Sequence, residues 1–126
     1  MSHISKIELE IKDIDTLRKA CSRLGLEFMK EQKVFKWYGS RGECDHAIKV
    51  PNATYEIGVK KSQHGNGYEL VCDYYDKGIE KAIGKQGGLL KQAYAVEKTK
   101  AEARRKGYTV IEKNVDTGIR LHLRVS

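Results

Sequence analysis

The chain has 126 residues, of which 40% are hydrophobic and 33% charged, and only one is proline, a composition typical of a folded protein and unlike that of a disordered one. No apolar run reaches the roughly 18 residues that a membrane span needs, and the N-terminus lacks the apolar block of a signal peptide, so we expect a single cytoplasmic domain (1–126) with no membrane partner. The net charge of +7 makes a polyanionic partner worth testing, but it is lower than the charge density of a DNA-coating protein.

The first two thirds of the chain alternate mainly between extended segments and turns. Residues 5–12 alternate apolar and polar side chains, which indicates a half-buried strand, and Asp13 can cap the helix that follows it. The pair Pro51-Asn52 favours a turn between two strands. The expected elements are a strand at 5–12, a short helix ending at Gly25, extended chain at 26–38, a loop at 39–42, a hairpin of strands 45–50 and 54–60, a loop at 62–67 and a strand at 68–74.

The last third predicts a long helix followed by a hairpin. A helical turn is expected around Ile79, the helix itself runs from about Leu89 to Lys106, and Gly107 stops it. Strands 108–115 and 119–125 then alternate about a turn at Asp116, with the apolar residues of the last strand inward and its basic residues outward. This order favours an α+β fold, with a largely antiparallel sheet, two helices on one face and a ferredoxin-like core with additional strands.

Several short motifs, in this order along the chain, carry a family resemblance. They are Met1-Ser2-His3, Leu24-Gly25-Leu26, Tyr55-Glu56-Ile57-Gly58, Gly67-Tyr68-Glu69-Leu70-Val71-Cys72-Asp73, Leu90-Lys91-Gln92-Ala93-Tyr94-Ala95 and Gly118-Ile119-Arg120-Leu121. The chain resembles an uncharacterised family of small proteins, a conserved reading frame of unknown function in some algal plastid genomes, cyanobacteria, other bacteria and phages. The resemblance spans nearly the whole chain and implies no catalytic residue. The chain departs from the family's usual Asp-Gly-Ser-Ile order at Asp116-Thr117-Gly118-Ile119.

The long helix and its approach hold most of the positive charge. Residues 79–107 contain eight Lys or Arg against three Glu, which gives +5 of the chain's +7. On a helical wheel, Leu89, Val96 and Ala103 form an apolar row, and the opposite ridge is formed by Lys91, Lys98 and Arg105. The ridge can follow nucleic-acid phosphates, with Tyr94 at its edge stacking on a base. The alternative is a solvated helix face without a ligand.

Three charged residues lie beside the apolar row, where an amphipathic helix is usually apolar. Lys100 and Arg104 could bind an anion in a pocket, with Glu97 orienting them, or could extend past the edge of the sheet. Lys85 lies in the Gly-rich stretch 84–88, where free backbone N–H groups at a helix start favour anions. This stretch lacks the Walker pattern and is otherwise a flexible turn, so we expect no nucleotide cofactor.

Catalytic and metal motifs are weak. No Ser/His/Asp or Cys/His constellation stands out, which predicts a protein that is not an enzyme. The nearest approach to a metal site is Cys44 with His46 and His64, which falls short of a zinc signature, so no metal is expected. The three cysteines should be free thiols, and Cys44, in a polar loop, should be the most reactive.

The leading expectation is therefore a small basic binding module for nucleic acid or another phosphate-bearing ligand. One alternative is an adaptor or self-assembling subunit that pairs through the edge strands of the terminal hairpin and through outward aromatics such as Tyr38 and Tyr75. Another is a binder that sequesters a small nucleotide-like anion between the Gly-rich stretch and Lys100 or Arg104.

Overall fold

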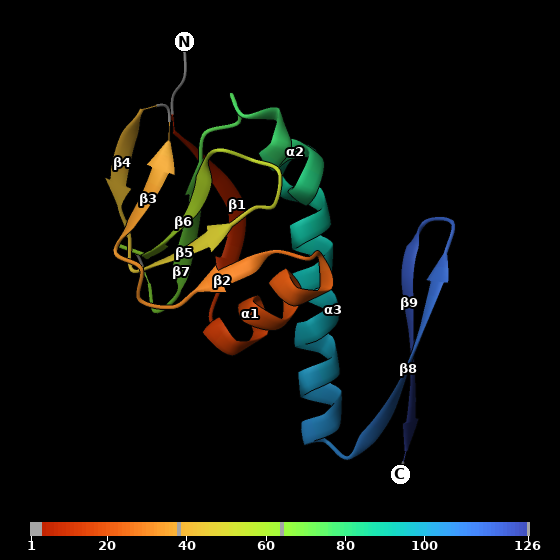
Figure 1. Cartoon of the computed structure of the whole chain (residues 1–126). Coiled ribbons are helices and arrows are strands. Elements are labelled where there is room, and N and C mark those ends of the chain that lie inside the picture. The colour runs from red at the N-terminus through yellow and green to blue at the C-terminus, as the bar shows by residue number, and fades with distance from the viewer. Residues whose placement is uncertain (1–3, 38, 64, 126) are drawn as a thin grey trace.

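The computed structural model describes residues 4–37, 39–63 and 65–125, and within these ranges the chain forms three α-helices and nine strands (Figure 1). Five of the strands make one antiparallel sheet, which divides the main body into two sides. In spatial order these strands are β1 (Ser5–Ile11), β7 (Tyr68–Cys72), β6 (Glu56–Lys61), β5 (His46–Lys49) and β2 (Glu27–Met29).

The helices lie together on one side of this sheet (Figure 1). They are α1 (Ile14–Arg23), α2 (Lys77–Ile83) and α3 (Gly88–Arg105), with a 3-10 turn η1 (Lys85–Gly87) before α3. The first two begin at aspartates: Asp13 accepts a hydrogen bond from the N–H of Asp15, and Asp76 accepts one from the N–H of Gly78. These side chains satisfy N–H groups that have no partner inside the helix.

The main core fills the space between the sheet and the helices. Its fully buried side chains include Leu17, Ala20 and Cys21 of α1, Ile79 and Ile83 of α2, Leu90 of α3, and Ile7, Ile48, Ile57, Val59 and Leu70 of the sheet. Each large aliphatic side chain that is fully buried contributes roughly 1.5–3 kcal/mol relative to an exposed one. This core fixes α3 against the sheet along one face of the helix.

A small hairpin covers the other side of the sheet. We call it the flap: it consists of β3 (Val34–Trp37) and β4 (Ser40–Glu43), which pair only with each other in the described chain. Phe35 points from the flap onto the sheet, and its ring lies so close to Gly58 of β6 that a Cβ there would be 2.6 Å from two ring carbons. Gly42 is equally close to the ring from the other strand of the flap. The two glycines make the space that seats the flap.

The chain ends in a second separate hairpin, the C-terminal ribbon, formed by β8 (Tyr108–Val115) and β9 (Gly118–Val125). It stands beside α3 and away from the sheet (Figure 1). None of its residues, all of which the structure describes, is fully buried, and none belongs to either core cluster. A two-stranded hairpin without a core is marginally stable in water, so its contacts with α3 decide its position.

Much of the predicted fold is confirmed. The α+β class, the largely antiparallel sheet and the helices on one face are as expected, as are the hairpin that turns at Pro51, the long helix and the terminal hairpin. The helical turn expected around Ile79 is a complete short helix, α2. In a ferredoxin-like core, the strand after the second long helix would return to the sheet beside β1. Here β1 is an edge strand and the ribbon stays outside the sheet.

The flap region differs from the prediction in one place. The segment expected to be extended does contain strands, of which β2 joins the main sheet and β3 belongs to the flap. The Gly-rich residues 39–42, predicted as a loop, lie mostly in β4, because Arg41 and Gly42 pair with Lys36 and Phe35. Composition favours a loop there, but the pairing is decided by the fit of the Phe35 ring against the sheet.

Replacing Gly58 with alanine should displace the flap. The added methyl group would overlap the Phe35 ring, and overpacking of this kind typically costs about 1–3 kcal/mol of unfolding free energy. Denaturant unfolding measures the loss. The matched control is Gly88→Ala, where nothing lies within 4 Å of the added Cβ and the backbone is already helical; it should be neutral or stabilising by up to about 1 kcal/mol. Equal effects of the two substitutions would contradict the packing of the Phe35 ring against Gly58.

Candidate functional site

The predicted basic ridge of α3 lies on the solvent side of the helix. Lys98 and Arg105 are exposed and Lys91 is half-exposed, and none of them forms an ion pair within the described ranges. Lys85 is also exposed, in η1. These four side chains are accessible to a ligand, although their accessibility does not distinguish a binding surface from a solvated one.

The apolar row opposite the ridge faces the ribbon and not the sheet. Val96 and Ala103 are buried, yet neither belongs to the cores formed with the sheet. They lie on the side of α3 where Gln92 meets the ribbon turn, since a helix advances about 100° per residue. Leu89, the first residue of the row, lies near the start of the helix and is 46% exposed.

Tyr94 is not available to a nucleic-acid base. Its side chain is only 4% exposed and packs in the main core, and its hydroxyl accepts a hydrogen bond from the backbone N–H of Lys12 at 3.2 Å. The prediction that it stacks on a base beside the ridge is therefore wrong. The wheel placed Tyr94 at the edge of the basic face, but the edge of that face is where α3 contacts the sheet.

Lys100, which was predicted to bind an anion together with Arg104, is paired with carboxylates in the structure. Its ammonium lies 3.4 Å from Glu112 of the ribbon and 3.6 Å from Glu97. Arg104 is exposed and has no carboxylate partner in the described chain. Glu97 pairs with Arg23 and Lys100 as a member of an ion cluster.

We call this ion cluster the α1–α3–β8 network; it consists of Arg23, Glu97, Lys100 and Glu112. The Arg23 guanidinium donates to Glu112 through two nitrogens, at 2.9 and 2.7 Å, and to Glu97 at 3.1 Å. The Glu97 side chain is only 9% exposed. The charges of the two cations and the two carboxylates cancel. The bidentate contact between the Arg23 guanidinium and the Glu112 carboxylate is the strongest form of charged hydrogen bond. The network therefore ties the ribbon to both long helices.

The network also shifts the pKa values of its members. Hydrogen bonding from Arg23 lowers the pKa of Glu112 from about 4.5 to about 2, and Lys100 adds to the effect. The same hydrogen bond raises the pKa of Arg23. Both groups therefore stay charged throughout the neutral range, and the inner side of the ribbon carries no spare positive charge.

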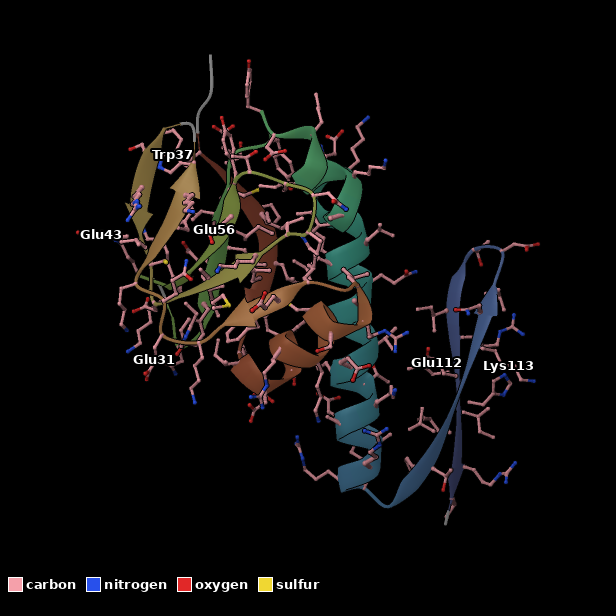
Figure 2. The ribbon with its side chains drawn as sticks, viewed as in Figure 1. Glu31, Trp37, Glu43, Glu56, Glu112 and Lys113 are labelled. Carbon is pink, nitrogen blue, oxygen red and sulfur yellow. The ribbon has the colours of Figure 1, made fainter. Side chains whose placement is uncertain are left out.

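The outer side of the ribbon is different, because its cations are unpaired. Residues directly opposite each other in an antiparallel pair share a face. Glu112 lies on the face toward α3, whereas Lys113 lies on the outer face (Figure 2). Lys113 is directly opposite Arg120, and His122 and Arg124 continue along the same face. These four side chains are exposed, and none forms an ion pair in the part of the chain that is described.

Sequence reasoning noted the outward basic residues of the last strand but did not assign them a role. The signal was present in the alternation of Arg120, His122 and Arg124 with apolar residues. The binding site was predicted on the long helix instead, because most of the lysines lie there. With the ribbon included, residues 79–126 contain eleven Lys or Arg and five Asp or Glu, which accounts for +6 of the chain's +7.

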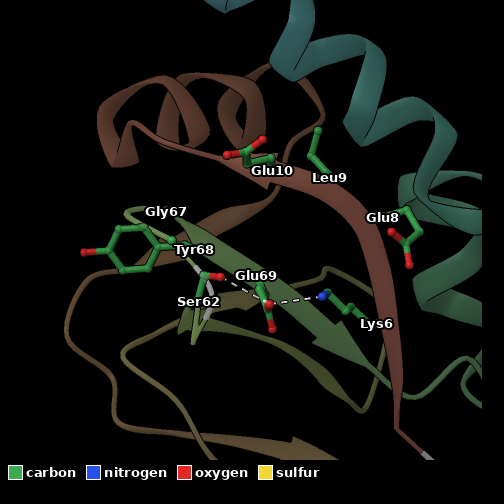
Figure 3. Close-up of a pocket in the computed structure, with 9 residues that line it drawn as sticks. Lys6, Glu8, Leu9, Glu10, Ser62, Gly67, Tyr68 and Glu69 are labelled. Atoms are coloured by element: carbon green, nitrogen blue, oxygen red, sulfur yellow. Dashed lines mark hydrogen bonds and ion pairs between the residues drawn. The ribbon is translucent and has the colours of Figure 1, made fainter.

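The cavity at the β1–β7 edge does not suit an anion. It measures about 340 Å³ and is lined by Lys6 together with the carboxylates Glu8, Glu10 and Glu69 (Figure 3). Its lysine is paired with Glu69 at 3.0 Å, and Ser62 also contacts that carboxylate at 3.4 Å. The lining therefore has an excess of negative charge.

Other expected chemistry is limited by burial. Cys44 was predicted to be the most reactive thiol, but it is buried, it donates to the carbonyl of Gln32, and burial raises its pKa to about 11. Among the described residues, no group of three His, Cys, Asp or Glu side chains could hold a metal ion. His64, of the weak metal motif, and Tyr38, one of the outward aromatics, lie outside the described residues. Tyr75 is 59% exposed. No helix in the described ranges is long and apolar enough to cross a membrane.

Replacing Arg23 with methionine should loosen the ribbon. The substitution leaves Glu97 and Glu112 facing each other without their shared cation, and loss of one partly buried partner costs roughly 1–3 kcal/mol. We expect lower unfolding free energy and faster hydrogen exchange of the β8 amides. Arg18→Met is the control: it is on the same helix, its pair with Asp15 is exposed, and it should cost less than about 1 kcal/mol. Unchanged exchange in β8 after Arg23→Met would argue against the network as the ribbon's anchor.

Acid should weaken the same contact. Because the pKa of Glu112 is lower in the folded chain than in the unfolded one, its pairing stabilises the fold above about pH 4.5, and this stability is lost as the pH falls toward about 2. Unfolding free energies of the wild type and Glu112→Gln, measured across that interval, should converge as the pH decreases. A difference that stays constant with pH would show that the ionised carboxylate does not contribute.

Comparison with known proteins identifies the family. Residues 20–122 match the model of a family described as "Protein of unknown function (DUF1257)". The chain is also similar to the uncharacterized protein ycf35 of Guillardia theta, with 30% identity over 73 residues, which cover 58% of this chain and 56% of that protein. The chain thus aligns with little more than half the length of that relative. No solved structure matches it. Since the family model covers most of the chain, this protein belongs to the DUF1257 family.

Proposed function

We propose that this protein binds double-stranded nucleic acid through the phosphate backbone, using the outer face of the C-terminal ribbon. The observation that carries the proposal is the placement of Lys113 directly opposite Arg120, with no carboxylate partner for either among the described residues. Like charges directly opposite each other destabilise an antiparallel pair. A phosphate bound between the two side chains would remove that repulsion.

The distribution of charge supports this assignment. Residues 1–78 are nearly neutral, since almost all of the net charge belongs to residues 79–126. Within that C-terminal part, Lys100 is neutralised by the α1–α3–β8 network. The cations without an ion pair in the described ranges include those of the outer ribbon face and of the α3 ridge, and they create a positive potential that attracts a polyanion.

Shape and composition favour a duplex over a single strand. A two-stranded ribbon has the dimensions that the major groove admits. Sequence-tolerant binding of single strands depends on aromatic side chains that stack on bases. The outer face carries no Phe, Tyr or Trp, and Tyr94 is buried. Contacts would thus be made mainly to phosphates, which gives binding with little dependence on base sequence.

A second candidate function is protein pairing through the same ribbon, as an adaptor or self-assembling subunit. Leu123 is 49% exposed and Val125 is 78% exposed, and the outer edge of β9 pairs with no strand of the described chain. An unpaired edge with exposed apolar residues is a template for strand addition. Light scattering across a concentration series distinguishes this candidate: a constant mass of 14.3 kDa would exclude self-assembly.

The test of duplex binding is fluorescence anisotropy with labelled DNA and RNA duplexes over a range of salt concentrations. Affinity should fall with salt, and three ribbon cations account for a log–log slope of roughly −3. The triple substitution Lys113→Ala, Arg120→Ala and Arg124→Ala should remove that part of the slope and weaken binding at least tenfold at low salt.

The control removes the same charge elsewhere. Lys19, Lys60 and Lys61 are exposed lysines on the main body with no ion pair in the described ranges, and their replacement by alanine gives the same net charge as the ribbon variant. It should bind with nearly wild-type affinity. If both variants lose affinity equally, net charge and not the ribbon is responsible. Binding that is absent even at low salt would reject the proposal.

A further inference from the structure

A continuous groove runs between the flap and the turn that joins β5 to β6, on the side of the sheet away from the helices. It consists of three adjoining cavities of about 530, 470 and 210 Å³. Lys36 lines all three, Tyr55 lines the two larger ones, and Glu56 lines the two that reach the sheet. Their shared lining shows that they are compartments of one depression.

The groove concentrates cations that have no partner. Lys36 of β3 and Arg41 of β4 are directly opposite each other in the flap, and Lys49 approaches the same small cavity from β5. None of the three side chains forms an ion pair or a hydrogen bond within the described ranges. Three cations, two from the flap and one from the main sheet, line the same cavity and are suited to the oxygens of one phosphate group.

A buried carboxylate lies beside these cations. Glu56 is 6% exposed, and its Oε1 accepts hydrogen bonds from Gln32 Nε2 at 3.1 Å and from the N–H of Lys36 at 3.0 Å. These two bonds fix the side chain beneath the flap. Its other oxygen, Oε2, accepts from no described residue, so it can accept a hydrogen bond from a hydroxyl group of a ligand.

Two aromatic residues line the largest cavity, and Trp37 is the one that lies on the flap. Trp37 is half-buried and packs against the Phe35 cluster, whereas Tyr55, just before β6, packs against the main core. Figure 2 places Trp37 on the flap and Glu56 on the sheet beneath it. A planar ring can be held there by stacking or edge contacts with the indole of Trp37.

We propose that this groove binds a free ribonucleotide. Its phosphate contacts Lys36, Arg41 and Lys49, its base packs against Trp37, and a ribose hydroxyl donates to Oε2 of Glu56. A simple anion would use neither the aromatic end nor the free oxygen of Glu56. The combination of cations, one buried acceptor and aromatic surface fits a ligand that has an anionic end, a hydroxylated centre and a planar ring.

This site is independent of the duplex-binding surface proposed above. The flap covers the side of the sheet opposite to the helices, and the ribbon stands beside α3 (Figure 1). The two proposals can therefore fail separately.

The only tryptophan of the chain lies in this groove, so its fluorescence reports occupancy directly. Titration with AMP, ADP and ATP, excited at the red edge of tryptophan absorption and repeated by calorimetry, should give saturable quenching with a dissociation constant below a millimolar. Inorganic phosphate should compete without quenching, and adenosine should bind at least tenfold more weakly than AMP. No saturable signal from any nucleotide, or equal affinity for adenosine and AMP, would overturn the proposal.

Substitutions distinguish the contributions. Lys36→Ala with Arg41→Ala removes two exposed cations and should weaken ATP binding at least tenfold, while circular dichroism verifies the fold. Glu56→Gln keeps an oxygen for Gln32 and Lys36 but loses the second acceptor, and should remove most of the preference for AMP over its 2′,3′-dideoxy analogue. The ribbon triple variant is the control and should bind ATP normally. An unchanged affinity in the Lys36/Arg41 variant, or a short oligoribonucleotide that quenches at lower concentration than ATP, would reject the free-nucleotide assignment.

Discussion

The position of Arg23 between Glu97 and Glu112 determines what the C-terminal third of this protein presents to solvent. The ribbon has no core of its own, and its apolar inner residues cover only the Val96 side of α3. The bidentate contact from Arg23 to Glu112 fixes which face of the ribbon turns toward the helix. Because opposite faces alternate along a strand, fixing Glu112 inward places Lys113 outward, together with every basic residue that shares its face.

The same network separates neutralised charge from available charge. Lys100 contributes to the net charge of the chain but has two carboxylates within 4 Å, so it cannot attract a distant polyanion as an isolated lysine does. The cations of the outer ribbon face have no such partners in the part of the chain that the structure describes. Charge counting along the sequence treats both groups alike. The location of the carboxylates decides which of them can bind a ligand.

The limits of prediction from the sequence follow from the same geometry. Periodicity was sufficient for α3, for β8 and β9 and for the β5–β6 hairpin, because each has a clear pattern of its own. It could not show what each face contacts. The partners Arg23 and Glu97 are 74 residues apart, and Arg23 and Glu112 are 89 apart, so no local pattern reports them. The flap depends on Phe35 fitting over Gly58, a contact between two segments that each look unremarkable alone.

Burial explains the remaining differences between expectation and structure. The helical wheel placed Tyr94 at the edge of the basic ridge, and polar neighbours placed Cys44 in an exposed loop, but both side chains lie in hydrophobic cores. The groove beneath the flap was missed for the opposite reason. Lys36, Arg41 and Lys49 are scattered in the sequence and converge only when the flap folds over the sheet. Sites built from several short elements have no signature in a single sequence.

The outer face of the C-terminal ribbon is the proposed binding surface for duplex nucleic acid. The most direct measurement is an NMR titration of the labelled protein with a short DNA duplex at low salt. We expect the largest shifts of backbone amides at Lys113, Arg120 and Arg124, smaller shifts along the solvent face of α3, and none in the flap. Shifts confined to the main sheet and the flap, with the ribbon amides unaffected, would contradict it.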